Sequence, residues 1–432
     1  MLFRFCLYGF LKNQRYFEPF LILVLLDYGL SFFLIGILIA CRDVTVNILE
    51  VPSGAIADSF GRRKSMMVSF IAYIASFAIL GSSSQVGILI AGMILYGVGD
   101  TFRTGTHKAM IFEWLRLNGR TDEKTRIYGF TRSWSQIGSA VSGLIAAGFI
   151  LISGNYRYVF FFAIVPYLMN LVNFAGYPRE LDGDHQKAGS VRESMSRLKY
   201  TIKKSFSDLQ LRRLVVESMG WGGFFAAVKD YLQPVLQLLA IGLFAAWFLN
   251  EDAGGDSWFN NERKTALLIG PVYAVLFLLS AWGSRMSHRL VERSGNELTA
   301  SMYLWMCSCG LFALMSAAAW FEATLFVVAM FVLLHVLNNF WRPVLVSRFD
   351  EAAEAHEGAT VLSIESQAQR TATFIMAPLI GYIIDVARNT GAGETASYLP
   401  IGIAGCIVGV CSLLLWNWKT AGRETDGEED MG

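Results

Sequence analysis

The sequence predicts an all-α integral membrane protein with twelve transmembrane helices in two six-helix bundles. Among its 432 residues, 54% are hydrophobic and only 16% are charged, whereas a soluble chain carries about a quarter charged residues. The mean hydropathy is +0.44, and the apolar residues fall in repeated runs of roughly 20, the length that crosses the hydrocarbon core of a bilayer. This composition excludes a disordered chain, a collagen and a disulfide scaffold.

Twelve apolar runs are long enough to cross a bilayer, and a charged gap separates the first six from the last six. The predicted spans lie at 16–33, 35–58, 65–83, 86–112, 127–152, 158–176, 213–239, 265–284, 299–319, 323–346, 358–386 and 397–418. The predicted domains are a first bundle over 1–176, a cytoplasmic central loop over 177–212, a second bundle over 213–418 and an acidic cytoplasmic tail over 419–432.

The region 213–249 is too long for one straight span and too short for two. Lys229, Asp230 and Pro234 interrupt it. A second crossing would move the later basic loops to the outer side, so we predict one span. Residues 240–262 are then expected to form an amphipathic excursion on the outer surface, where Trp247 and Trp258 suit the interface.

The distribution of basic residues orients the chain, because Lys and Arg are retained on the cytoplasmic side. With the N-terminus inside, the inner segments hold 25 of the 36 basic residues, the outer loops hold 4, and 7 lie within spans. Both termini are therefore predicted to be cytoplasmic. Met1–Arg15 shows no cleavable signal peptide, so the first span is expected to direct insertion into the membrane. The expected location is the cell membrane, as the inner membrane of a bacterium.

No enzyme motif is visible. The six cysteines have neither disulfide-framework nor zinc spacing, and the sequence lacks a P-loop, an HExxH motif and a GxSxG motif. We expect no catalytic activity, no cofactor, no metal and no nucleic-acid partner. The expected partners are the lipid bilayer, a small solute and protons, and the expected state is a monomer.

The loop after the second span carries a specific motif, G-x3-D-x2-G-R-R-K, at Gly54, Asp58, Gly61, Arg62 and Arg63. It resembles the signature of the major facilitator superfamily between spans two and three, and the two six-helix halves and long central loop extend the resemblance over the whole chain. The resemblance implies alternating access, in which two bundles rock about a midplane site. It also implies that Asp58 and Arg62 belong to a cytoplasmic gate.

Three further segments are compared with family patterns. The equivalent loop of the second half is read at 283–289, where Ser287 stands in place of the acid, so asymmetric gating is expected. Span four resembles the Ser/Thr-Gly-x-x-Glu-Ala pattern of one branch of the superfamily, with Lys108 in place of the acid. That departure favours anionic substrates. Span five has only half of the antiporter signature, since no proline follows Gly129, Gly138 and Gly143, and close packing explains these glycines equally well.

Seven bases lie within the predicted spans, where one charge costs roughly 2.5–3.5 kcal/mol even on an insertion scale. Each must face water or the bundle interior, or be paired. Structural pairing, as of Arg42 with Asp27 or of Lys229 with Asp230, is the alternative to a transport role. The seven are Arg42, Arg103, Lys108, Arg132, Lys229, Arg342 and Arg370.

Span four carries the clearest polar face. On a continuous helix, Asp100, Arg103, Thr104, His107 and Ile111 fall within one arc. Asp100-Thr-Phe-Arg103 aligns with Asn339-Phe-Trp-Arg342, so these two arginines are expected to approach a cavity from opposite halves and to bind carboxylate or phosphate. The predicted substrate-binding residues are Arg103, Arg342, Arg132, Arg370 and Lys108.

Carboxylates and histidine inside spans are candidates for proton exchange. Span two places Asp43, Asn47 and Glu50 on one face. The predicted proton-coupling residues are Asp43, Glu50, Asp100, His107 and Asp27. The leading hypothesis is a proton-coupled secondary active transporter of a small polar, anionic solute. The alternatives are a drug/proton antiporter of the same fold, and a receptor or assembly protein that binds a ligand without moving it.

Overall fold

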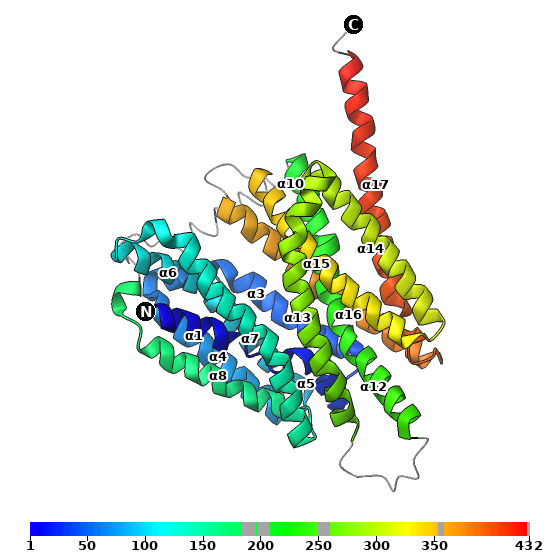
Figure 1. Cartoon of the computed structure of the whole chain (residues 1–432), viewed down its shortest axis with the longest axis horizontal. Helices are drawn as coiled ribbons and strands as arrows, with labels where there is room; N and C mark the ends of the chain where they lie inside the picture. Colours follow the sequence, from blue (N-terminus) through cyan, green and yellow to red (C-terminus); the bar gives the residue numbers. More distant parts are fainter. Residues whose placement is uncertain (183–195, 197–207, 249–259, 353–357, 430–432) are drawn as a thin grey trace. The chain divides into compact units, whose positions relative to one another are not determined.

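The computed structural model describes residues 1–182, 196, 208–248, 260–352 and 358–429, and every regular element in these ranges is helical (Figure 1). The α-helices are α1 Leu2–Lys12, α2 Leu21–Asp27, α3 Phe32–Phe60, α4 Arg62–Ser82, α5 Val86–Arg103, α6 Thr106–Leu117, α7 Lys124–Ser153, α8 Tyr158–Ala175, α10 Leu209–Ser218, α11 Phe224–Val228, α12 Leu232–Phe248, α13 Asn261–Ser294, α14 Glu297–Trp320, α15 Thr324–Ala352, α16 Gly358–Asn389 and α17 Leu399–Glu429. The 3₁₀ and π elements are η1 Glu18–Phe20, η2 Thr121–Glu123, η3 Arg179–Asp182, η5 Met219–Gly223, η6 Lys229–Tyr231 and η7 Ala396–Tyr398.

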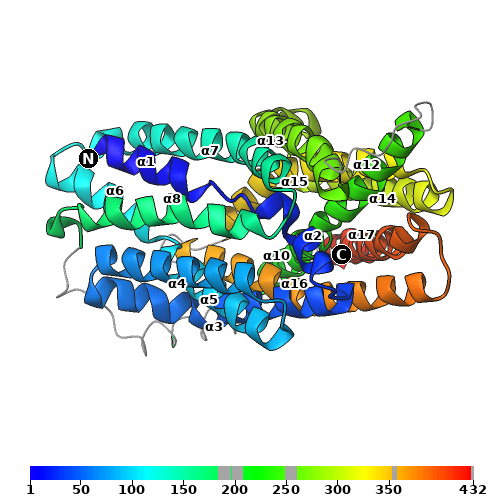
Figure 2. The same ribbon diagram turned by 90° about the horizontal axis from the view of Figure 1, so that it is seen from below.

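Eleven helical stretches within the described residues are long and apolar enough to cross a membrane. The first predicted span is missing from this set because its helix consists of two short pieces, α1 and α2. Helix α1 packs against α7 and α8 (Figure 2) and buries Phe5, Tyr8 and Leu11. We therefore place the first span at 2–27, and the prediction of 16–33 is wrong. Hydropathy missed α1 because Arg4 and Lys12 dilute its apolar residues.

Span four is also broken. Helix α5 ends at Arg103 and α6 begins at Thr106, because Gly105 adopts φ +79°, which a right-handed helix cannot contain. The predicted single arc is therefore wrong beyond Arg103. Thr104 is exposed, whereas His107 and Ile111 are buried.

Span seven is a single candidate span over 211–246, as predicted, but it is irregular. A π-helical turn at η5 and a 3₁₀ turn at η6 separate α10, α11 and α12. Helix α12 continues to Phe248, so the predicted surface excursion is wrong for 240–248. Trp258 and the side chain of Trp247 lie outside the described part.

The chain forms two compact units, one over Met1–Lys203 with Leu239–Phe277 and one over Lys204–Leu238 with Leu278–Gly432. In the first unit, α4 packs against α5 and α8, and α3 packs against α5. The start of α13 joins this unit through α7, where a Cβ on Gly270 would meet Ala147, and the Arg263 guanidinium donates to the α7 carbonyl of Leu151 at 2.9 Å. In the second unit, α14 packs against α15 and α17, and α16 packs against η5 and α11.

Two later helices extend beyond their predicted ends. Helix α13 runs on to Ser294, so the segment 283–289, predicted as a loop, is helical. The turn comes at Gly295, with φ +82°, and Asn296 caps α14 by accepting a hydrogen bond from the Thr299 backbone N–H at 2.7 Å. Helix α17 continues to Glu429, so most of the predicted tail is an extension of the last span.

Candidate functional site

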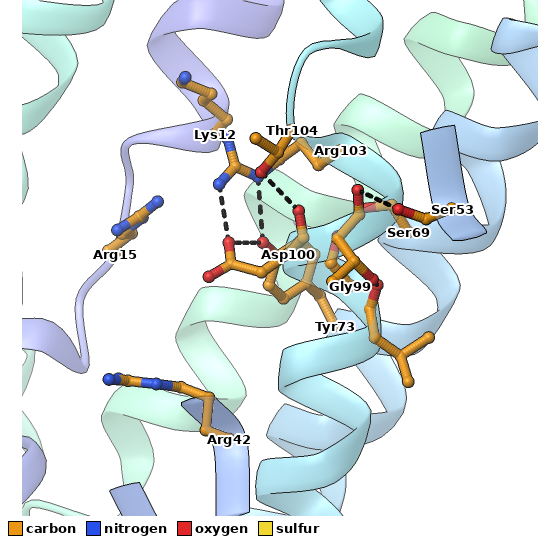
Figure 3. Close-up of polar contacts among 12 residues, drawn as sticks. Lys12, Arg15, Arg42, Ser53, Ser69, Tyr73, Gly99, Asp100, Arg103 and Thr104 are labelled. Atoms are coloured by element: carbon orange, nitrogen blue, oxygen red, sulfur yellow. Dashed lines mark hydrogen bonds and ion pairs between the residues drawn. The ribbon is translucent and has the colours of Figure 1, made fainter. Parts of the chain in front are cut away.

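The first unit contains a buried polar network at the C-terminal end of α5. The Arg103 guanidinium donates to the Asp100 carboxylate at 2.7 Å and to the Tyr73 hydroxyl at 3.0 Å, and that hydroxyl donates to the same carboxylate oxygen at 2.5 Å (Figure 3). The Arg103 and Asp100 side chains are 15% and 14% exposed. The arginine and the acid were both predicted site residues, and the structure brings them together as an ion pair.

Tyr73 reaches this pair because α4 and α5 pack very closely. A Cβ on Gly99 would stand 2.9 Å from the Tyr73 ring, and Ser69 donates to the Gly99 carbonyl at 2.6 Å. Sequence reasoning missed Tyr73. The tyrosine carries no charge and belongs to no motif, so only its distance from Asp100 identifies it.

Three further cations surround the pair in Figure 3: Lys12, Arg15 and Arg42. Arg42 pairs with its neighbour Asp43 at 2.8 Å, so the considered pairing of Arg42 with Asp27 is wrong, and Asp27 is exposed. Lys12 and Arg15 each repel Arg103 electrostatically. Both had been counted among the cytoplasmic bases, an assignment that the early start of the first span overturns.

The break between α1 and η1 is held by hydrogen bonds to distant helices. The Asn13 amide donates to the carbonyls of Gly9 and Ser135, each at 2.9 Å. The Gln14 amide donates to the Gly138 carbonyl at 3.2 Å, and the Tyr167 hydroxyl donates to the Lys12 carbonyl at 3.2 Å. Helices α7 and α8 thus stabilise a non-helical segment that lies inside the unit.

His107 and Lys108 have different surroundings although they are adjacent. The His107 ring lies against the Tyr8 ring, with centroids 3.8 Å apart, and its Nε2 has no hydrogen-bond partner among the described residues. Lys108 is exposed, and its ammonium group lies over the rings of Phe112 and Tyr128 at 5.6 and 5.5 Å. The structure gives Lys108 aromatic neighbours and places His107 in an aromatic cluster.

The other predicted residues are spread over both units. Arg132 and Arg342 are exposed, and Arg370 and Glu50 are half-buried. The predicted pairing of Lys229 with Asp230 is confirmed at 2.7 Å.

The two units repeat one close helix contact. A Cβ on Gly9 would meet Ser135 and the Thr131 carbonyl of α7, and a Cβ on Gly223 would meet Ala372 and the Gln369 carbonyl of α16. Arg132 and Arg370 directly follow Thr131 and Gln369, so each of these arginines lies next to such a contact.

The predicted gate motif surrounds the start of α4. Gly61 adopts φ +103°, and a Cβ there would stand 3.0 Å from the Asp182 carboxylate. Asp182 is buried and accepts from the Arg63 backbone N–H at 2.7 Å, while the Arg63 guanidinium donates to the Tyr177 carbonyl at 3.2 Å. The motif therefore anchors the start of the central loop.

The remaining gate residues are Gly54, Asp58 and Arg62. Gly54 is exposed and Arg62 is half-buried, while the side chain of Asp58 lies outside the described part. Because the turn after α13 comes at Gly295, the true counterpart of Asp58 is Glu292. The turn after α13 therefore has an acid, Glu292, and a glycine with positive φ, Gly295, but no bases follow the glycine as they follow Gly61. The second copy of the motif was expected at 283–289, and this position of the turn corrects that expectation.

The second unit contains a buried ion pair that the sequence did not reveal. Arg348 donates from Nη1 to both Glu217 carboxylate oxygens, at 2.8 and 2.9 Å, and to the Ser301 hydroxyl at 2.7 Å. Arg348 had been counted as an inner-loop base, but α15 extends past it and it is 7% exposed. It joins α10, α14 and α15.

Eleven apolar helical stretches among the described residues, arranged in two units, define a polytopic membrane protein. The model of the Major Facilitator Superfamily matches residues 5–370. The chain belongs to this family, as the motif at Gly54–Arg63 predicted, and the expectation that it is not an enzyme is confirmed because the family and its relatives are transporters.

An uncharacterized MFS-type transporter of Bacillus subtilis (strain 168), YxaM, is 25% identical over 224 residues, which cover 51% of this chain and 54% of that protein. The match therefore spans about half of this relative. Among solved structures, a mutant of the nucleoside transporter NupG superposes with a TM-score of 0.75 at 10% identity, covering 96% of this chain and 99% of that one. A D-xylose-proton symporter superposes with a TM-score of 0.63 at 16% identity, covering 96% and 95%. These likenesses show the fold.

Proposed function

We propose that this protein is a secondary active transporter that moves a small polar, anionic solute across the cell membrane by alternating access, coupled to protons. The observation that supports it is the surplus of cations around Asp100. The Asp100–Arg103 and Arg42–Asp43 pairs are each neutral, which leaves Lys12 and Arg15. Glu18 approaches Arg15 only to 3.8 Å and is 41% exposed.

A cation surplus within a membrane bundle favours an anionic ligand, because charges at that depth are costly unless they are paired or hydrated. A solute carboxylate or phosphate would supply the missing negative charge. The guanidinium of Arg103 presents a fork that such groups bind in bidentate fashion. Near this site the ring of Tyr73 packs against those of Tyr96 and Tyr167.

Proton coupling follows from competition at Arg103. The Asp100 carboxylate accepts a hydrogen bond from this guanidinium at 2.7 Å, so it would compete with a solute anion for Arg103. When Asp100 takes up a proton, its attraction for the guanidinium falls, and Arg103 becomes available to the solute anion. Asp43 on Arg42 offers the same exchange. In this scheme both termini are cytoplasmic, in agreement with the excess of bases in the inner segments.

Uptake into proteoliposomes tests the proposal. A panel of organic anions, one neutral sugar and one lipophilic cation is measured with and without an inward proton gradient. We expect accumulation of at least one anion only with the gradient, near-complete loss in Arg103→Gln, and gradient-independent exchange in Asp100→Asn. Arg126→Gln is the matched control, since its side chain is 84% exposed.

Three results would contradict the proposal. Transport of the lipophilic cation alone would favour the drug/proton antiporter. Ligand-dependent stabilisation without any flux would favour the receptor. Full anion uptake by the Arg103→Gln variant would show that Arg103 does not bind the solute.

A further inference from the structure

The break in the first span places two cations within electrostatic reach of the Asp100–Arg103 pair. Lys12 is the last residue of α1, and Arg15 lies in the non-helical segment before η1. Figure 3 shows both side chains on the side of the pair where α1 and its continuation run. Within the described part of the chain Lys12 forms no ion pair, and the Nε of Arg15 is buried without a hydrogen-bond partner.

The backbone of the break is anchored to the neighbouring helices on both sides of these two cations. The amides of Asn13 and Gln14, which stand between Lys12 and Arg15, are both used on the α7 backbone. A Cβ on Gly138 would stand 2.5 Å from the Phe10 carbonyl, so the two helices touch at this level. The side chains of Asn13 and Gln14 bind α7, and the Lys12 carbonyl accepts from Tyr167. These contacts fix the backbone from which Lys12 and Arg15 extend.

Nearby acids offset the charges of these cations only in part, since Glu18 approaches Arg15 to 3.8 Å and is 41% exposed. Lys12, Arg15 and Arg103 repel one another, and the one fully engaged acid, Asp100, already accepts from Tyr73 and Arg103. A lysine supplies a mobile point charge and an arginine a planar fork, a combination that fits a tetrahedral or carboxylate oxyanion. Non-helical backbone at membrane depth is tolerated where it is buried in protein or lines an aqueous cavity.

We infer that the break of the first span is an oxyanion-binding element, in which Lys12 and Arg15 bind the anionic group of the solute while Asp100 holds Arg103. The inference rests on the proposed function and deepens it. The transporter would then recognise the charged end of its solute by residues of the first span, and Arg103 would join only when Asp100 releases it.

Ligand-dependent thermal stability of the full chain in neutral phosphatidylcholine nanodiscs tests this inference. The probes are sodium phosphate, sulfate, acetate and succinate at matched ionic strength, with chloride as the reference. We expect at least one oxyanion to raise the melting midpoint of the wild type. Lys12→Gln and Arg15→Gln should each weaken that apparent affinity roughly 10- to 100-fold, the loss of one charged hydrogen bond.

Arg15→Lys separates charge from geometry, and it should restore part of the affinity lost in Arg15→Gln. The control Arg126→Gln should respond as the wild type does, and midpoints without ligand report whether each variant folds. A second set of nanodiscs containing phosphatidylglycerol distinguishes a soluble oxyanion from a lipid headgroup.

The outcomes separate this inference from the proposed function. A wild-type shift that persists in both variants overturns the role of Lys12 and Arg15 and leaves the anionic solute standing. Stabilisation by phosphatidylglycerol alone, with none of the soluble probes, assigns the site to lipid and overturns the inference. No shift with any probe in the wild type overturns both.

Discussion

Replacement of Glu217 by Gln removes the only negative charge in the buried network of Arg348, Glu217 and Ser301 while keeping its shape. The two charged side chains are 8% and 5% exposed, so water cannot solvate the guanidinium that remains. Breaking a buried pair by removing one partner costs roughly 3–5 kcal/mol. We expect Glu217→Gln to lower the free energy of unfolding by about that amount.

The reverse change should cost less. Arg348→Met leaves the Glu217 carboxylate buried, but Arg213 lies within electrostatic reach of it and partly compensates. In the double variant neither member of the pair is charged, and replacing both members of such a pair is often close to neutral. The double variant should therefore be more stable than the sum of the single effects by at least about 2 kcal/mol.

SDS titration in mixed micelles, followed by tryptophan fluorescence, measures these free energies of unfolding. The matched control is Arg116→Gln, which removes an ion pair with Glu113 in which the arginine is 63% exposed; exposed pairs contribute roughly 0–1 kcal/mol. The reasoning is refuted if Glu217→Gln costs no more than this control, or if the two single effects are additive.

Two further predictions concern glycines, each with a matched control. In α7, Gly138→Ala would press a Cβ to 2.5 Å from a backbone carbonyl of α1, whereas Gly148 has open space around it. We expect Gly138→Ala to lower the free energy of unfolding by roughly 1–3 kcal/mol, and Gly148→Ala to leave it unchanged or raise it by up to about 1 kcal/mol. Equal melting midpoints for the two variants would contradict this. Gly61 and Gly119 both have positive φ, but only Gly61 faces Asp182. Gly119→Ala should lower the free energy of unfolding by roughly 1–2 kcal/mol, and Gly61→Ala should lower it more. A smaller shift of the melting midpoint for Gly61→Ala than for Gly119→Ala would show that the contact with the carboxylate is unimportant.

Local patterns predicted the fold and two members of the polar network around Asp100. Asp100 and Arg103 were found because they are three residues apart on one helix turn, and the gate motif was found because its glycines and charges are contiguous. Tyr73, Asp182 and Arg348 were missed. Each of them acts through a partner at least 27 residues away in the chain, and no periodicity within one helix reports such a contact.

The helix breaks show the same limit. Gly105 is a recognisable breaker, yet glycine is common in membrane helices, so its presence alone did not indicate a break. At 13–17 the break depends on hydrogen bonds from α7 and α8, which lie more than 120 residues further along the chain. A misplaced first span then put Lys12 and Arg15 among the cytoplasmic bases, although the structure places them near Asp100 and Arg103.

The sequence by itself determined the all-helical membrane architecture, the single crossing at 211–246 and the family. Hydropathy is sufficient for this because a bilayer forces every spanning segment to satisfy its own backbone hydrogen bonds, so each helix is encoded locally by about 20 apolar residues. Only the tertiary structure decided which charges are buried together and where the helices break. Those features depend on side chains and carbonyls from separate helices, and their energies exist only once the helices have packed.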